Sequence, residues 1–97
     1  MEVAWTRPAL RHLGAIADHI AQDSPAAAYR VARHLGTHTT ELLSATPMIG
    51  RLGRAKATRE LVFADLPYIV VYRVTEKVEI LAVVHTARKW PKRFGHA

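Results

Sequence analysis

The sequence contains no cysteine, which excludes disulfides, thiolate nucleophiles and cysteine-based metal sites. It has no apolar run close to the roughly 20 residues that a membrane-spanning helix needs. Residues 1–5 have neither the basic start nor the apolar stretch of a signal peptide, so we expect a cytoplasmic protein. Acidic residues are also few, with 8 against 14 lysines and arginines, and none follows Glu79. These absences argue against cysteine-based chemistry and against a membrane-spanning helix.

The most prominent property of the sequence is its positive charge. A formal net charge of +6 and an isoelectric point near 10.3 favour an acidic partner, such as nucleic acid, the ribosome or an acidic protein. A basic surface that serves only solubility is the alternative. The length of 97 residues and the hydrophobic content of 49% are those of a chain that folds around one core. We therefore expect residues 1–97 to form a single domain.

The first half of the chain predicts a strand and two helices. Residues 2–6 alternate polar and apolar side chains, as a short strand does. Thr6 stands two residues before Pro8, and Ser24 stands directly before Pro25. Each predicts the N-cap of a helix with apolar residues at intervals of three and four. Polar residues of the first helix, such as His12, are expected on its outer surface. The short connection predicts an antiparallel helix hairpin.

The second half predicts a basic loop and three strands. The second helix should end near Ala45, because Pro47 disfavours helical geometry in the residue before it. A loop follows, and strands are predicted over residues 59–63, 68–74 and 78–85, the last two forming a hairpin. The fold class is therefore α+β, with the helix hairpin packed on one face of an antiparallel sheet.

Strand alternation predicts which residues of the hairpin share a face. The face under the helices should contain Val70, Tyr72, Val74, Ile80, Ala82 and Val84. The open face should contain Ile69, Val71, Arg73, Glu79, Leu81, Val83 and His85. Arg73 and His85 would then lie on the same face of the sheet.

The second helix has a cluster of polar side chains. His34 and His38 stand four residues apart, a spacing that can hold zinc, but no glutamate lies between them and no third ligand is evident. We expect no metal site. Arg30 and Arg33 make this face basic, and Tyr29 is expected in the core or at its edge.

Several local strings in this order resemble the RelE/ParE superfamily of toxins from type II toxin-antitoxin systems. They are residues 50–53 (Gly-Arg-Leu-Gly), 58–61 (Thr-Arg-Glu-Leu), 68–74, 78–81 and 84–91. The resemblance covers nearly the whole chain and implies a microbial-ribonuclease-like fold with no cofactor. It also implies a hetero-oligomer with a cognate antitoxin, whose acidic, partly disordered segment wraps the toxin.

The superfamily contains two activities. RelE-like members cut messenger RNA on the ribosome, whereas ParE-like members, known also as plasmid stabilisation proteins, poison DNA gyrase. In the RelE-like pattern an arginine follows the tyrosine that begins the central strand, and Ile69 stands there in this sequence. A second arginine is expected just beyond the last strand, where this chain has Ala87 and then Arg88. The sequence therefore favours a ParE-like toxin that binds gyrase and is not an enzyme.

A ribosome-dependent messenger RNA endoribonuclease is the alternative. RNA cleavage needs acid-base groups and cations around the phosphate. The candidate catalytic residues are Arg59, Arg73, His85 and Arg88, with Glu60 beside them. Each has a structural alternative: Arg73 as a cross-strand ion pair with Glu79, His85 as a core-edge residue, and Arg59 as a surface charge. A toxin that is inactive and only binds an antitoxin is a third possibility.

Binding to gyrase or the antitoxin is expected to use basic residues of the loop, the open face and the C-terminal stretch. The candidates are Arg51, Arg54, Arg59, Arg73, His85, Arg88, Lys89, Trp90, Lys92 and Arg93. For the antitoxin we expect the open sheet face and the basic C-terminal stretch to form the surface, held partly by charge pairs.

Overall fold

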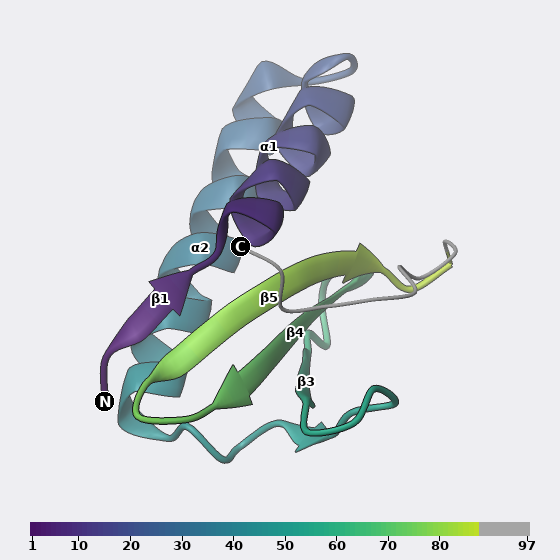
Figure 1. The fold of residues 1–97 in the computed structure, drawn as a ribbon. Helices are drawn as coiled ribbons and strands as arrows, with labels where there is room; N and C mark the ends of the chain where they lie inside the picture. Colours follow the sequence, from purple (N-terminus) through teal and green to yellow (C-terminus); the bar gives the residue numbers. More distant parts are fainter. Residues whose placement is uncertain (88–97) are drawn as a thin grey trace.

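The computed structural model of the chain describes residues 1–87. Its elements, in order, are β1 (Val3–Trp5), α1 (Arg7–Ala21), α2 (Pro25–Ala45), β2 (Arg51–Leu52), β3 (Arg59–Val62), β4 (Tyr68–Val74) and β5 (Val78–His85) (Figure 1). The five strands form one sheet in the order β1-β5-β4-β3-β2. The predicted α+β class is confirmed.

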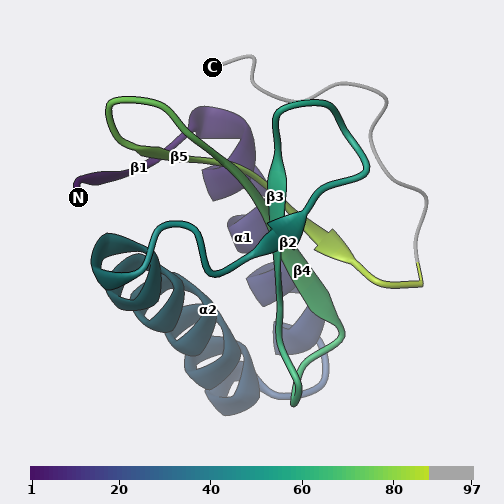
Figure 2. The ribbon, with the colours of Figure 1, turned by 90° about the horizontal axis from the view of Figure 1, so that it is seen from below.

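The two helices begin where their capping residues predict. Thr6 Oγ1 accepts a hydrogen bond from the Ala9 N–H at 3.4 Å, and Ser24 Oγ accepts one from the Ala27 N–H at 3.1 Å. Each bond satisfies one of the main-chain donors that a helix start leaves without a partner. α1 and α2 run antiparallel beside each other on one side of the sheet (Figures 1 and 2).

The sheet is mixed, whereas the sequence predicted an antiparallel one. β1 pairs with β5 in parallel, and all other neighbouring strands are antiparallel. The chain leaves β1 through the helix hairpin, enters the far side of the sheet at β2 and returns strand by strand to β1. β2 itself is a two-residue strand inside a segment predicted as a loop, too short for any alternation to mark it.

A β-bulge interrupts the pairing of β4 with β5. Val71 pairs with Ala82, but the next residue, Tyr72, pairs with Ile80, so Leu81 is an extra residue on β5. One extra residue reverses the alternation of every side chain beyond it. The predicted faces are therefore wrong after Leu81.

The side chains beyond the bulge divide between two clusters in the corrected order. Ala82 and Val84, predicted under the helices, join Ile69 and Val71 in a cluster on the opposite side of the sheet. Val83, predicted on the open face, belongs to the core under the helices. That core is built around Tyr72, Leu35, Leu43, Ile80, Val70 and Val78, each less than 2% exposed. Over residues 1–87, neither helix is long and apolar enough to cross a membrane.

Candidate functional site

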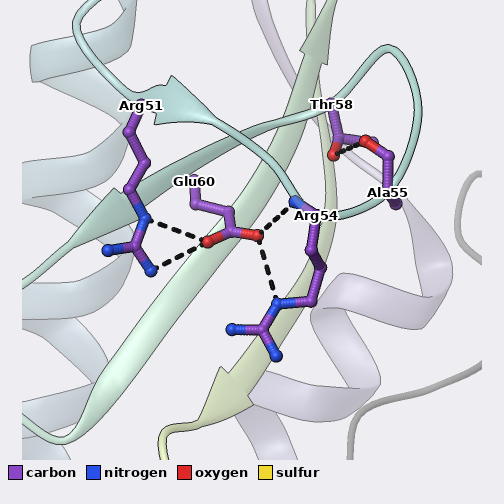
Figure 3. A network of polar contacts seen from close by, with 5 residues as sticks. All are labelled: Arg51, Arg54, Ala55, Thr58 and Glu60. Carbon is purple, nitrogen blue, oxygen red and sulfur yellow. Dashed lines mark hydrogen bonds and ion pairs between the residues drawn. The ribbon is translucent and has the colours of Figure 1, made fainter.

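The basic loop between β2 and β3 is organised by one buried carboxylate, that of Glu60 (Figure 3). Glu60 Oε1 accepts hydrogen bonds from Arg51 Nη2 at 2.9 Å and from Arg51 Nε at 3.1 Å. Glu60 Oε2 accepts from the Arg54 N–H at 2.9 Å and lies 3.5 Å from Arg54 Nε. The Glu60 side chain is 3% exposed, whereas those of Arg51 and Arg54 are 57% and 55% exposed. The carboxylate thus anchors two guanidinium groups that face solvent.

Two opposing effects act on the pKa of the Glu60 carboxyl. Burial raises the pKa, because it disfavours the charged form. The hydrogen bond from the Arg54 main chain, the Arg51 hydrogen bond and the charges of both arginines lower it, and together they outweigh burial. The pKa lies below its ordinary value, so Glu60 is ionised at neutral pH.

The loop closes on itself between Gly53 and Thr58. The Gly53 N–H donates to the Thr58 carbonyl at 2.8 Å, and Thr58 Oγ1 donates to the Ala55 carbonyl at 2.6 Å. Ala57 has a φ of 61°, a conformation that costs a residue with a Cβ atom about 1 kcal/mol or more. Beside the loop lies a hollow of about 560 Å³, whose lining includes Arg54, Lys56, Arg59 and the apolar Met48, Leu52 and Val74.

Arg59 holds the segment that enters the loop. Its Nη1 donates to the Gly50 carbonyl at 2.7 Å and to the Met48 carbonyl at 3.2 Å. The Gly50 N–H in turn donates to the buried Tyr72 hydroxyl at 2.8 Å. Arg59 was a candidate phosphate ligand or surface charge, and it is engaged with the main chain of its own protein.

Arg73 and Glu79 form the cross-strand ion pair that was the alternative to a catalytic role. Arg73 Nε lies 2.8 Å from Glu79 Oε1, and the two residues pair across β4 and β5. The hydrogen bond with Glu79 raises the pKa of Arg73, and the same bond lowers the pKa of Glu79. The ion pair occupies Arg73 on the open side of the sheet.

His85 lies on the opposite side of the sheet from Arg73, so the prediction that they share a face is wrong. The bulge at Leu81 reverses the direction of His85, whose ring meets the Tyr68 ring edge-on at a centroid distance of 5.4 Å. Its Nδ1 accepts a hydrogen bond from the Ala87 N–H at 3.0 Å. The position agrees with the alternative of a core-edge histidine.

The structure thus brings together three of the predicted binding residues, Arg51, Arg54 and Arg59, around the basic loop. Of the other candidates, Arg73 is paired with Glu79, His85 lies at the opposite end of β4, and the rest fall beyond the described residues. These are Arg88, Lys89, Trp90, Lys92 and Arg93, outside residues 1–87.

Two aromatic side chains were placed wrongly from the sequence. Tyr29 was expected in or beside the core but is 64% exposed, and its hydroxyl accepts a hydrogen bond from Arg33 at 2.9 Å. His12 was expected on the outer surface of its helix, but it is half-buried and its Nδ1 accepts the Val83 N–H at 3.2 Å. The bond gives a partner to a main-chain N–H of β5 that lies beyond the end of β1, which pairs with β5 only as far as Ile80. No sequence pattern marks it, because the partners are 71 residues apart.

His34 and His38 form a stacked pair on α2. Their ring centroids lie 5.2 Å apart with an angle of 7° between the planes, and both rings meet Phe63 edge-on. His34 Nε2 lies 3.8 Å from Asp65 Oδ2. Within residues 1–87 no group of three or more histidine, aspartate or glutamate side chains is placed to hold a metal ion.

The fold and its basic loop define a class: small, basic α+β toxins of the RelE/ParE type. Within it, residues 3–90 match the family described as ParE toxin of type II toxin-antitoxin system, parDE. The chain belongs to this family, as the resemblance of its local strings predicted.

Individual relatives agree with this assignment. A protein of Sinorhizobium fredii named as toxin Y4kP is 48% identical over 90 residues, which is 93% of each chain. Toxin RelE2 of Caulobacter vibrioides is 43% identical over 88 residues, 90% of this chain and 97% of that protein. A structure titled as the chromosomal ParDE TA system from P. aeruginosa superposes with a TM-score of 0.78 at 26% identity, over 88% of this chain and 95% of that one.

Proposed function

We propose that this toxin arrests growth by binding and poisoning DNA gyrase, without chemistry of its own, and that a cognate antitoxin neutralises it. The observation that carries the proposal is the separation of Arg73 from His85 on opposite sides of the sheet. A base, an acid and cations must converge on one phosphate for metal-free RNA cleavage. Arg73, Arg59 and Glu60 are instead engaged with groups of their own chain.

A ribosome-dependent endoribonuclease is the second candidate. Identity of 43% to a protein named RelE2 favours it, as does the cationic lining of the hollow beside the basic loop. In this reading Arg54, Lys56 and Arg59 would hold phosphate groups. His85 pairs with Tyr68, four residues along β4 from Tyr72, which is the partner of Arg59, and this displacement along the sheet argues against His85 as their acid-base partner.

The decisive test is a supercoiling assay with purified gyrase and relaxed plasmid. We expect the toxin to block supercoiling and to accumulate cleaved DNA that stays covalently attached to gyrase. A preparation that arrests growth but leaves gyrase unaffected at excess toxin would overturn the proposal. The same preparation, added to ribosomes translating a defined messenger, should leave the messenger intact. Cleavage there would establish the second candidate.

His85 provides a discriminating variant. A lost acid-base group slows a reaction by roughly a hundredfold or more. His85→Gln should leave growth arrest unchanged within a few fold if the toxin acts by binding gyrase. Lys77→Gln, on the β4–β5 turn, is the matched control for a change of similar size elsewhere.

A further inference from the structure

The outer edge of β3 is covered along only half of its length. β2 pairs with Arg59 and Glu60 and with no later residue of β3. The Gly53 N–H donates to the Thr58 carbonyl, so the main-chain N–H and C=O of Thr58 point toward β2. Because these groups alternate in direction along a strand, those of Glu60 and Val62 point to the same side. The residues before Gly50 do not extend β2 alongside Val62, because the Ile49 N–H donates to the Thr46 carbonyl in a turn. Among the described residues, no strand meets Val62 on that side, and its side chain is 48% exposed.

A hollow adjoins this uncovered edge on the helix side. It has a volume of about 320 Å³ and lies between α2 and the end of β3. Its lining comprises His34, His38 and Leu42 from α2, and Leu61, Val62, Phe63, Ala64 and Asp65 from β3 and the turn after it. The floor is thus apolar and aromatic, which suits an apolar side chain directed inward from a strand beside Val62.

The charges around the hollow favour an acidic occupant. A second hollow, of about 410 Å³, shares His34 and His38 and is also lined by two cations, Arg30 and Arg33, against one carboxylate, that of Glu41. Arg51, the first residue of β2, pairs with Glu60 and so stands where the uncovered part of the β3 edge begins. Of the residues that line the first hollow, Asp65 carries a carboxylate, and His34 lies 3.8 Å from it. Because each chain has a net charge of +6, repulsion disfavours a second copy as the occupant.

We infer that an extended, acidic segment of the cognate antitoxin adds to the sheet as a strand beside Val62, in line with β2, and places an apolar side chain between α2 and Phe63. Strand addition of this kind gains affinity from main-chain hydrogen bonds and specificity from a pocket for alternate side chains. The inference rests on the proposed neutralisation by an antitoxin, and it is independent of whether gyrase is the target.

Hydrogen exchange tests the inference on the unaltered complex. In the free toxin the Val62 N–H should exchange quickly, because it points to solvent at an uncovered edge. In the complex, formed with the antitoxin co-expressed with this toxin, its exchange should slow by about a hundredfold or more. The Glu76 N–H, in the exposed β4–β5 turn, is the internal control and should not change. Unchanged exchange at Val62 in a complex that forms would overturn the inference.

A pair of variants at one position supplies the second measurement. Val62→Pro removes the outward N–H, whereas Val62→Ala keeps it and trims the same side chain. We expect Val62→Pro to weaken antitoxin binding at least tenfold relative to Val62→Ala. Equal affinities of the two folded variants would count against strand addition. If Val62→Pro does not fold, the exchange of the wild-type complex decides. Both measurements report antitoxin binding itself, so their outcome does not depend on whether the toxin inhibits gyrase.

Discussion

Gly50 shows how one residue without a side chain controls the entry to the basic loop. A Cβ atom at Gly50 would lie 2.5 Å from the Tyr72 hydroxyl oxygen and 3.0 Å from the Glu60 carbonyl oxygen. Tyr72 is fully buried, so its ring has little room to move. Gly50→Ala should therefore lower the free energy of unfolding by about 1–3 kcal/mol, the cost of overpacking a filled core.

Gly14 is the matched control for this substitution. It lies inside α1, where an added Cβ meets nothing within 4 Å. Gly14→Ala should stabilise the fold by about 1 kcal/mol, through the better helix propensity of alanine. Urea unfolding of both variants at neutral pH measures the two effects. A Gly50→Ala protein as stable as the wild type would show that Tyr72 does not confine this position.

His12 couples the stability of the fold to pH near neutrality. Burial lowers the pKa of His12, and the nearby charge of Arg11 lowers it further, from the ordinary value of 6.5. The neutral ring is the form that accepts the Val83 N–H. Because the pKa in the folded state is below that of the unfolded chain, the unfolded chain binds the extra proton first. The contribution of His12 is therefore complete above about pH 6.5 and declines as the pH falls through the lowered value.

His12→Asn isolates this effect, because the amide oxygen of asparagine accepts a hydrogen bond at a position close to that of Nδ1 and does not titrate. We expect the wild type to lose stability relative to His12→Asn between about pH 6.5 and pH 5. The measurement is the midpoint of urea unfolding for both proteins across this range. His19→Asn, at an exposed site on the same helix, should keep the wild-type slope.

At the scale of elements, the sequence predicted what local chemistry determines. Both helix starts follow from the hydroxyl caps, and the β4–β5 hairpin follows from its β-branched residues and polar turn. The bulge could not be predicted, because residues 81–84 are apolar and buried on both sides of the sheet. With no polar residue to mark a face, the reversal at Leu81 leaves no trace in the pattern. The predicted active-site face depended on that alternation and was wrong for His85.

The ionised carboxylate of Glu60 stabilises the β2–β3 connection, and this contribution to the stability of the fold depends on pH. The lowered pKa of Glu60 means that its contribution to stability is present above the usual carboxyl range, near pH 4–5, and is lost as the pH falls through the lowered value. Glu60→Gln should cost about 1–3 kcal/mol at pH 7, the range for hydrogen bonds to a charged group.

The difference between the two proteins should shrink as the pH falls below about 4, where the wild-type carboxyl also becomes neutral. Urea unfolding at pH 7 and pH 3 measures it. Glu76→Gln, in an exposed turn, is the control for loss of one negative charge and should differ little from the wild type. An equal destabilisation by Glu60→Gln at both pH values would contradict the ionic role of Glu60.

At the scale of the whole molecule, the net charge of +6 predicted an acidic partner, and family membership implies one in the antitoxin. Sequence alone named Arg51, Arg54 and Arg59 as candidate binding residues, and the structure holds all three around one loop. It could not identify Glu60 as the group that anchors two of them, because a buried carboxylate and its arginines are recognised only by their contacts. The uncovered edge beside Val62 was likewise invisible, since it depends on where β2 stops.

A chain with this charge should attract its antitoxin over a distance, and salt should weaken that attraction. Charges separated by more than about 10 Å are largely screened at 0.1 M salt. We expect the association rate with the antitoxin to fall steeply between about 0.05 and 0.5 M salt, with a smaller change in dissociation. Lys56→Gln, in the exposed basic loop, should reduce the low-salt rate more than Arg7→Gln, which removes the same charge from the start of α1. Stopped-flow kinetics at several salt concentrations measures both. Equal rates for the two variants would mean that the attraction depends on total charge alone, and a rate independent of salt would exclude electrostatic steering.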